Sequence, residues 1–244
     1  METKETIKLR PTFGGSLGHG WNTMMRFFLI LLLVVIVMAF ITAPMSMGNL
    51  NMKFDLDDFG WGGDLGDIFN TGFVALGMLA LILGLIAIAY SLMIVPIFKY
   101  GSDMMFVQAA RGTRPEFDTL IRGFKENYLY IVLANLLVGA LVMLGFIFLI
   151  IPGIIVACRL AFVSYLVMDK KLDPIVAVEE SWKLTKGHGF TIFFMAIVAF
   201  FLSIIGLAFL FVGILPVIMW FKSSFASLYE AVLIEKNELT AEAA

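Results

Sequence analysis

The chain has 244 residues, of which 61% are hydrophobic, and its formal net charge is −2. Its mean hydropathy of +0.96 implies more apolar surface than a water-soluble domain can cover with polar residues, so a soluble protein is excluded. The charge gives no support to a nucleic-acid partner, and a single cysteine, Cys158, excludes an intrachain disulfide and a cysteine metal cluster.

Six apolar runs predict an all-α integral membrane protein. A transmembrane helix needs about 20 consecutive apolar residues, and a helix satisfies its own backbone hydrogen bonds within the bilayer. The predicted spans cover residues 26–45, 73–98, 127–151, 153–168, 189–211 and 213–233. The fourth run has only 16 residues and contains Arg159, so a re-entrant segment is the alternative there.

The distribution of positive charge favours six complete spans. With six spans, 14 of the 17 lysines and arginines fall on one side of the membrane, Lys53 alone falls on the other, and two lie inside spans. This asymmetry follows the positive-inside rule and predicts that both termini are cytoplasmic. If the fourth run did not cross, Lys170, Lys171, Lys183 and Lys186 would face outward.

We expect the six spans to form three hairpins. The predicted segments are a cytoplasmic interfacial segment at 1–25, a first hairpin at 26–98 with an acidic outer loop at 46–72, an interfacial arm plus second hairpin at 99–168, an interfacial arm plus third hairpin at 169–235, and a cytoplasmic tail at 236–244. Glycines weaken any helix before the first span. Pro96 is expected to kink the second span, which can continue as a helix to Ala110. The acidic loop does not fit a calcium-binding EF-hand, because Phe59 and Gly66 stand where oxygen ligands are needed.

A short polar arm before the third span predicts a first interfacial helix. Pro115 suits its first turn, Arg122 lies in its last turn, and Gly123 suits a left-handed cap. The apolar side chains of this arm would enter the headgroup region, while Arg122 and Lys125 stay near the phosphates of anionic lipids.

A second arm, after the fourth span, has the same pattern. Asp173 is a suitable N-cap, Pro174 is the first helical residue, Lys186 comes late and Gly187 provides the cap. We therefore predict a second helix at the membrane surface, with Lys186 as a further contact to anionic lipid.

The two arm-and-hairpin units predict an internal repeat. Gly123 and Gly187 are each followed by a proline after 29 positions, and the same offset of 64 residues pairs Tyr165 with Tyr229. Both units would run in the same direction across the membrane, unlike the inverted repeats of many secondary transporters.

Two cations, Arg159 and Lys222, lie inside predicted spans. A charged side chain in the hydrocarbon costs about 2.5–3.5 kcal/mol, so each needs a carboxylate, water or a path along which it can reach the surface. One interpretation is a polar pocket for lipid phosphate or an anionic solute. The sequence favours the other, a structural contact or a side chain that extends to the surface, because no acidic residue is predicted at the same depth.

The sequence contains no motif of an enzyme active site. The HExxH, Walker, GxSxG and CxxC patterns are absent, and the two histidines, His19 and His188, are far apart. We therefore expect a protein that is not an enzyme and that needs no metal or cofactor.

Two stretches, QAARGTRPEFDTLIRGF and IIPGIIVACRLAFVSYLVMDKKLDPIVAVEESWKLTKGHG, carry a family resemblance. Over residues 100–235 the chain resembles a six-span bacterial membrane protein family related to the membrane domain of glycerophosphodiester phosphodiesterases. The matching positions are Arg111-Gly112, Gly123-Phe124, Pro152-Gly153, Asp169, Pro174, Ala177, Ser181 and Gly187. In the enzymes of that group the reaction belongs to a separate soluble barrel after the last span. This chain ends shortly after its last predicted span, so the resemblance implies an architecture in the bacterial inner membrane and no catalytic residue.

These observations lead to two functional hypotheses. The first is a non-catalytic inner-membrane protein that is a structural or accessory component of a membrane assembly, with phospholipid, other membrane subunits or a second copy as partners. The alternative is a carrier or channel for a lipid-like or small anionic solute that uses Arg159 and Lys222.

Overall fold

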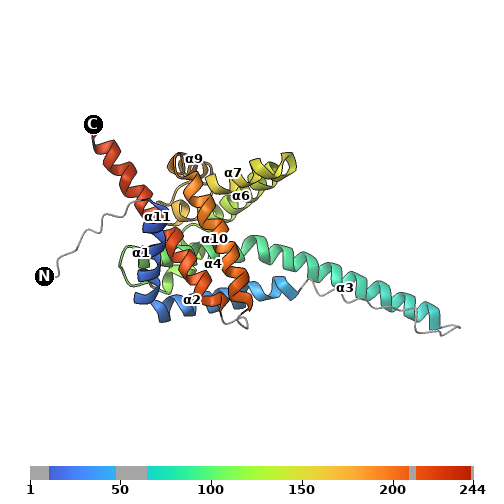
Figure 1. The fold of residues 1–244 in the computed structure, drawn as a ribbon. Helices are drawn as coiled ribbons and strands as arrows, with labels where there is room; N and C mark the ends of the chain where they lie inside the picture. The colour runs from blue at the N-terminus through green and yellow to red at the C-terminus, as the bar shows by residue number, and fades with distance from the viewer. Residues whose placement is uncertain (1–10, 48–64, 209–212, 243–244) are drawn as a thin grey trace.

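The structure, a computed structural model, describes residues 11–47, 65–208 and 213–242, so most of the predicted acidic loop at 46–72 lies outside the described residues. Every element in these ranges is an α-helix (Figure 1). The helices are α1 (Phe13–Arg26), α2 (Phe28–Met47), α3 (Leu65–Met93), α4 (Val95–Ala110), α5 (Asp118–Lys125), α6 (Tyr128–Phe148), α7 (Ile150–Arg159), α8 (Val163–Asp169), α9 (Pro174–Leu184), α10 (Gly189–Ala208) and α11 (Ile214–Glu242). The predicted all-helical class is confirmed for the described part of the chain.

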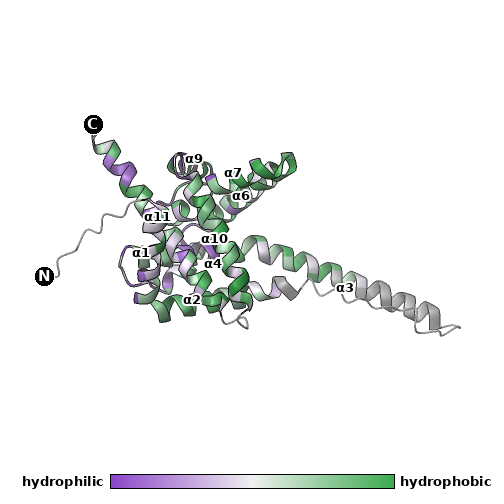
Figure 2. Cartoon of the chain, in the orientation of Figure 1, coloured by the Kyte–Doolittle hydropathy of each residue, from purple (hydrophilic) through white to green (hydrophobic). Residues whose placement is uncertain are grey.

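Five helical stretches are long and apolar enough to cross a membrane, and a sixth is reached if the bent pair α1 and α2 forms one span. The five are Gly77–Ala110, Tyr128–Phe148, Ile150–Asp169, Gly189–Leu207 and Ile214–Leu239. Figure 2 shows apolar residues along most of α6, α7 and α10. The fourth predicted run is thus 20 residues long in the structure and has the length to span a bilayer. The chain is a multi-pass membrane protein by these criteria.

The N-terminal helix α1 corrects an expectation from the sequence. The glycines before the first span were expected to weaken any helix, yet α1 is a regular helix capped by Thr12, whose hydroxyl accepts from the Gly15 amide at 3.3 Å. Its packing against α11 explains the difference, because Gly20 is buried and a Cβ there would overlap the backbone of Ser224. Tertiary packing therefore outweighs the low helix propensity of glycine.

Helix α4 packs against most of the other helices. As Pro96 predicts, the second span breaks at Ile94, and α4 then continues to Ala110, after which Gly112 adopts a φ of 75°. Figure 1 shows α3 projecting away from the other helices, whereas α4 lies among them and contacts α1, α2, α5, α6, α8 and α11. Its Met105 and Phe106 are completely buried. The same helix also buries Ser102 and Asp103, so it holds polar side chains inside the protein.

The two arm helices confirm one set of predictions and contradict another. Helix α9 begins at Pro174 with Asp173 as its cap, whose carboxylate accepts from the Ile175 amide at 3.1 Å, and Gly187 has a φ of 97°. The prediction for the first arm is wrong at both ends, because α5 begins at Asp118 and continues through Gly123 to Lys125.

Gly123 therefore serves close packing in place of a left-handed cap. A Cβ at this position would lie 2.6 Å from Ile131 Cδ1 and 2.8 Å from Ile97 Cγ2. The missing side chain allows α5 to approach α4 and α6, both of which it contacts.

The 64-residue offset relates positions that meet in the structure. Helix α7 begins at Ile150, and α11 begins 64 positions later at Ile214. The rings of Tyr165 and Tyr229 stack with their centroids 5.0 Å apart and an angle of 25° between planes. Both side chains are buried, so the corresponding tyrosines of the two units share one packing site at the centre of the protein.

Candidate functional site

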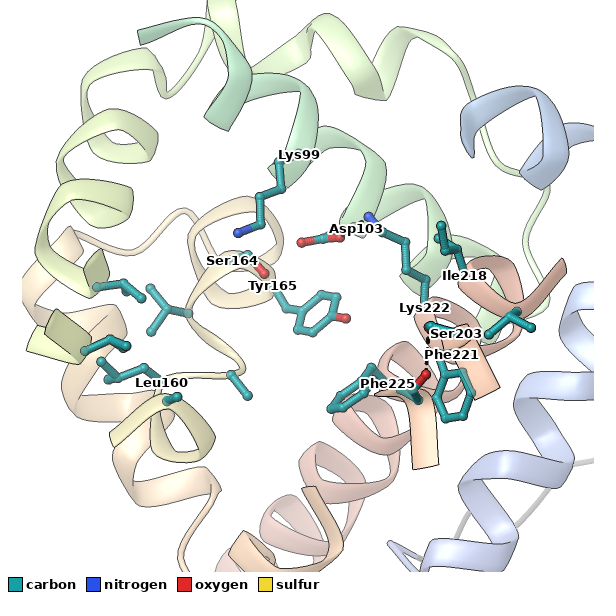
Figure 3. A pocket seen from close by; sticks show the side chains of 17 residues that line it. Lys99, Asp103, Leu160, Ser164, Tyr165, Ser203, Ile218, Phe221, Lys222 and Phe225 are labelled. Carbon is teal, nitrogen blue, oxygen red and sulfur yellow. Dashed lines mark hydrogen bonds and ion pairs between the residues drawn. The ribbon is translucent and has the colours of Figure 1, made fainter. Parts of the chain in front are cut away.

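A pocket of about 510 Å³ lies between α4, α6, α7, α8, α10 and α11 (Figure 3). Six of its lining residues are polar or charged: Lys99, Asp103, Ser164, Tyr165, Ser203 and Lys222. The others are apolar, among them Val138, Val142, Ala199, Val217 and Phe225. An apolar cavity of this size with a few polar groups is typical of a small-molecule or lipid site.

An ion pair between Lys222 of α11 and Asp103 of α4 stands at this pocket. Lys222 Nζ donates to Asp103 Oδ1 at 2.8 Å and to Ser102 Oγ at 2.9 Å, and it lies 5.5 Å from the centre of the Phe106 ring. The side chains are 30% and 12% exposed. The expectation that no acidic residue lies at the depth of Lys222 is therefore wrong. The continuation of α4 to Ala110 carries Asp103 into the helical body, where 12% of its side chain is exposed.

Lys99 is a pocket residue that sequence analysis did not single out. It precedes Asp103 by one helical turn, so both side chains lie on the same face of α4. Lys99 is exposed, and Figure 3 shows its side chain reaching from α4 toward the side of the pocket where the Asp103 carboxylate lies. The four-residue spacing on a helix that was expected to continue to Ala110 was a usable signal, but sequence analysis did not apply it to this pair.

The wall of the pocket contains a break in a membrane span. Between α7 and α8, residues 160–162 form a turn, and Leu160 and Ala161 line the pocket. The Ser181 hydroxyl of α9 donates to the Arg159 carbonyl at 2.7 Å and accepts from the Phe162 amide at 3.3 Å. One side chain thus satisfies a backbone group on each side of the break.

Arg159 is outside the set of residues that line the pocket. Its guanidinium lies 5.7 Å from the centre of the Trp182 ring on α9, and its buried Nη1 has no hydrogen-bond partner among the described residues. The structure therefore separates the two intramembrane cations that sequence analysis treated together. Lys222 belongs to the pocket, and Arg159 stacks on an aromatic ring of the second arm.

The other predicted lipid contacts lie on the two arms. Arg122 is within 3.9 Å of Glu116 and 3.8 Å of Asp118, and Lys125 is 3.8 Å from Asp118. Lys186 is exposed between α9 and α10. Exposed pairs at such distances contribute little to stability, so these cations are free to exchange partners.

A second charged cluster, which sequence analysis did not pair, joins α4, α8 and α11. Arg111 donates from Nη1 and Nη2 to the two Asp169 oxygens at 2.7 and 2.6 Å, and from Nε to Glu230 Oε1 at 2.7 Å. The Tyr229 hydroxyl donates to Asp169 at 3.1 Å. All three charged residues lie near the ends of apolar runs, and this position was the feature of the sequence that could have pointed to the cluster.

The two arms are connected by an ion pair that gives the first testable prediction. Lys171 Nζ lies 2.7 Å from Glu126 Oε2, and the hydrogen bond and charge of Lys171 hold the pKa of Glu126 below its ordinary value of 4.5. A lowered folded-state pKa stabilises the fold above the unfolded value, and this contribution disappears as the pH falls through the folded value. Glu126→Gln should therefore lower the melting temperature near neutral pH, and the difference from the wild type should shrink as the pH falls through the folded-state pKa of Glu126.

The matched control for this pair is Glu179→Gln, which removes an exposed carboxylate from α9. The difference in melting temperature between Glu179→Gln and the wild type should not change from pH 3 to 7. A pH-independent difference between Glu126→Gln and the wild type would contradict the assigned role of the pair.

Among the described residues, no group of three or more His, Cys, Asp or Glu side chains is placed to hold a metal ion. Comparison with known proteins finds no matching family model, curated protein or solved structure. The resemblance to the membrane domain of glycerophosphodiester phosphodiesterases therefore stays a prediction.

Proposed function

We propose that this chain is a non-catalytic membrane protein that binds anionic phospholipid in the pocket between α4, α6, α7, α8, α10 and α11. The pocket itself carries the proposal. Its apolar wall suits an acyl chain, and the charged groups Lys99, Asp103 and Lys222 suit a headgroup. The protein would act as a structural or accessory component of a membrane assembly, together with other membrane subunits or further copies of itself.

The proposed topology is six spans in three hairpins in the bacterial inner membrane, with both termini cytoplasmic. The strongly asymmetric distribution of lysine and arginine supports this arrangement. Helices α5 and α9 would lie at the cytoplasmic surface. Three apolar side chains of the first arm, Phe117, Ile121 and Phe124, are 41–44% exposed, as expected for side chains that enter the headgroup region.

Replacing two alanines of α10 by tryptophan, one at a time, tests lipid binding in the pocket. Ala199 lines the pocket, whereas Ala196 is exposed on the same helix and is outside the lining. Ala199→Trp should fill part of the cavity, and the purified protein should lose most of the phospholipid that accompanies the wild type. Ala196→Trp should retain it. Native mass spectrometry and lipid extraction provide the measurement.

Equal lipid content in Ala199→Trp, Ala196→Trp and the wild type would overturn the proposal, provided that all three melt at similar temperatures. The same would follow if the wild type carried no phospholipid after mild purification.

A second candidate function, a carrier for a lipid-like or small anionic solute, is favoured by one specific observation. Transporters commonly form their binding sites at interrupted helices, and the break at residues 160–162 lines this pocket. The test is movement of fluorescent phosphatidylglycerol between the leaflets of liposomes that contain the protein. Lipid movement that Ala199→Trp abolishes and Ala196→Trp preserves would favour the carrier. Binding without movement would favour the accessory role.

A further inference from the structure

We propose that the pocket selects lipids with a single net negative charge, that Lys99 recognises this charge, and that Lys222 is kept from doing so by Asp103. This inference rests on the proposed function, since it names the class of lipid that the same pocket holds. It assigns different tasks to two lysines that line one site.

The first step concerns Lys222, whose charge is already compensated. Its ammonium donates to Asp103 at 2.8 Å and to Ser102 at 2.9 Å, and only 12% of the Asp103 side chain is exposed. Taking one member of such a pair away leaves the other charged and poorly solvated, which costs several kcal/mol. A ligand therefore meets Lys222 and Asp103 as a neutral pair.

The second step concerns Lys99, whose charge is not compensated. Within the described ranges, no carboxylate lies within 4.0 Å of its ammonium, and Asp103, the only acidic residue of the pocket lining, is paired with Lys222. Two lysines and one aspartate give the lining a net charge of +1. A ligand with one negative charge therefore brings the net charge of the lining to zero.

The third step identifies the lipid class. A phosphodiester headgroup with no cation of its own brings one negative charge, and the hydroxyl of Ser164, which also lines the pocket, can donate to a phosphate oxygen. A zwitterionic headgroup would place its own cation near Lys99. A phosphomonoester carries a charge between −1.5 and −2 at neutral pH, so part of its charge would have no partner unless Lys222 left Asp103.

The experiment uses the full chain in nanodiscs of phosphatidylcholine that contain phosphatidylglycerol or phosphatidic acid. Spin-labelled lipids give the association constant of each lipid relative to phosphatidylcholine. The wild type should prefer phosphatidylglycerol by roughly tenfold, the effect of one charged hydrogen bond. Lys99→Gln should abolish the preference and Lys99→Arg should keep it. Lys170→Gln, which removes an exposed lysine outside the pocket lining, should leave it unchanged.

Asp103→Asn supplies a change in the opposite direction. It frees Lys222 and raises the charge of the lining to +2, so selectivity should shift toward phosphatidic acid. The double variant Lys99→Gln/Asp103→Asn returns the lining to +1 and should recover the preference for phosphatidylglycerol. Oleate, a carboxylate with one negative charge, provides a further arm. If oleate displaces bound phosphatidylglycerol, the pocket recognises the negative charge alone. A fatty acid is then an alternative ligand to a phospholipid.

An unchanged preference in Lys99→Gln would overturn this inference, as would equal binding of all lipids by the wild type. If Asp103→Asn fails to fold, the comparison of Lys99→Gln with Lys99→Arg decides, because Lys99 is exposed. Failure of the proposed function is distinguishable, since Ala199→Trp would then release no lipid of any charge. If Ala199→Trp releases all lipids but Lys99→Gln changes no preference, the pocket binds lipid without selecting its charge.

Discussion

Replacing Arg111 with glutamine is expected to lower the free energy of unfolding by about 2–4 kcal/mol, because two largely buried carboxylates lose their only cation within bonding distance among the described residues. Asp169 and Glu230 are each 12% exposed, whereas Arg111 is 33% exposed, so water weakens the effect relative to a fully buried cluster. Three helices depend on this guanidinium: α4 ends next to it, and α8 and α11 provide its partners.

Chemical denaturation in detergent micelles measures this change, with Arg114→Gln as the matched control. Arg114 lies three residues away, and its side chain is exposed. A triple variant, Arg111→Gln with Asp169→Asn and Glu230→Gln, should recover much of the loss, because no charge then stands without a partner. An effect of Arg111→Gln no larger than that of Arg114→Gln would show that the cluster does not hold the helices together.

Gly101→Ala is expected to destabilise the protein by about 1–3 kcal/mol, although alanine is normally the better helix former. A Cβ at this position of α4 would lie 2.7 Å from the Leu120 carbonyl oxygen and 2.8 Å from the Leu120 Cα and the Thr119 carbonyl oxygen. All three are backbone atoms, so the contact is relieved only if α5 moves as a whole.

The control for this prediction is Gly84→Ala on α3, where a Cβ would have no atom within 4 Å. There the ordinary preference for alanine should be visible as an unchanged or slightly raised melting temperature. The two substitutions make the same chemical change in successive apolar helices, so opposite signs in thermal unfolding would assign the effect to packing. Equal effects would contradict the tight contact between α4 and α5.

The apolar runs were sufficient to predict the helical class and most helix positions, because a run of such length has one stable form in lipid. Local capping signals were sufficient for α9, where Asp173 and Gly187 behave as their residue types suggest. The same reasoning failed at Gly123, since a glycine that allows close packing and a glycine that ends a helix look the same in a sequence. Only the neighbouring helix distinguishes them.

The candidate site was harder to predict, because its charged residues come from distant parts of the chain. Lys222 and Asp103 are 119 positions apart, and Arg111 is 58 and 119 positions from its two partners. Counting charges inside spans found Lys222 and Arg159, but it could not pair them or place Lys99 beside the same pocket. The continuation of α4 to Ala110 was expected, but no pattern in the sequence shows which distant residues that helix contacts.

The bridge that Ser181 makes across the break in span four has a mechanical consequence. Its hydroxyl joins α9 to the backbone on both sides of the break, and two residues of that turn, Leu160 and Ala161, form part of the pocket wall. A sideways displacement of α9 would therefore be transmitted directly to the cavity. Ser181 itself is outside the lining, so it is coupled to the cavity through hydrogen bonds to the backbone alone.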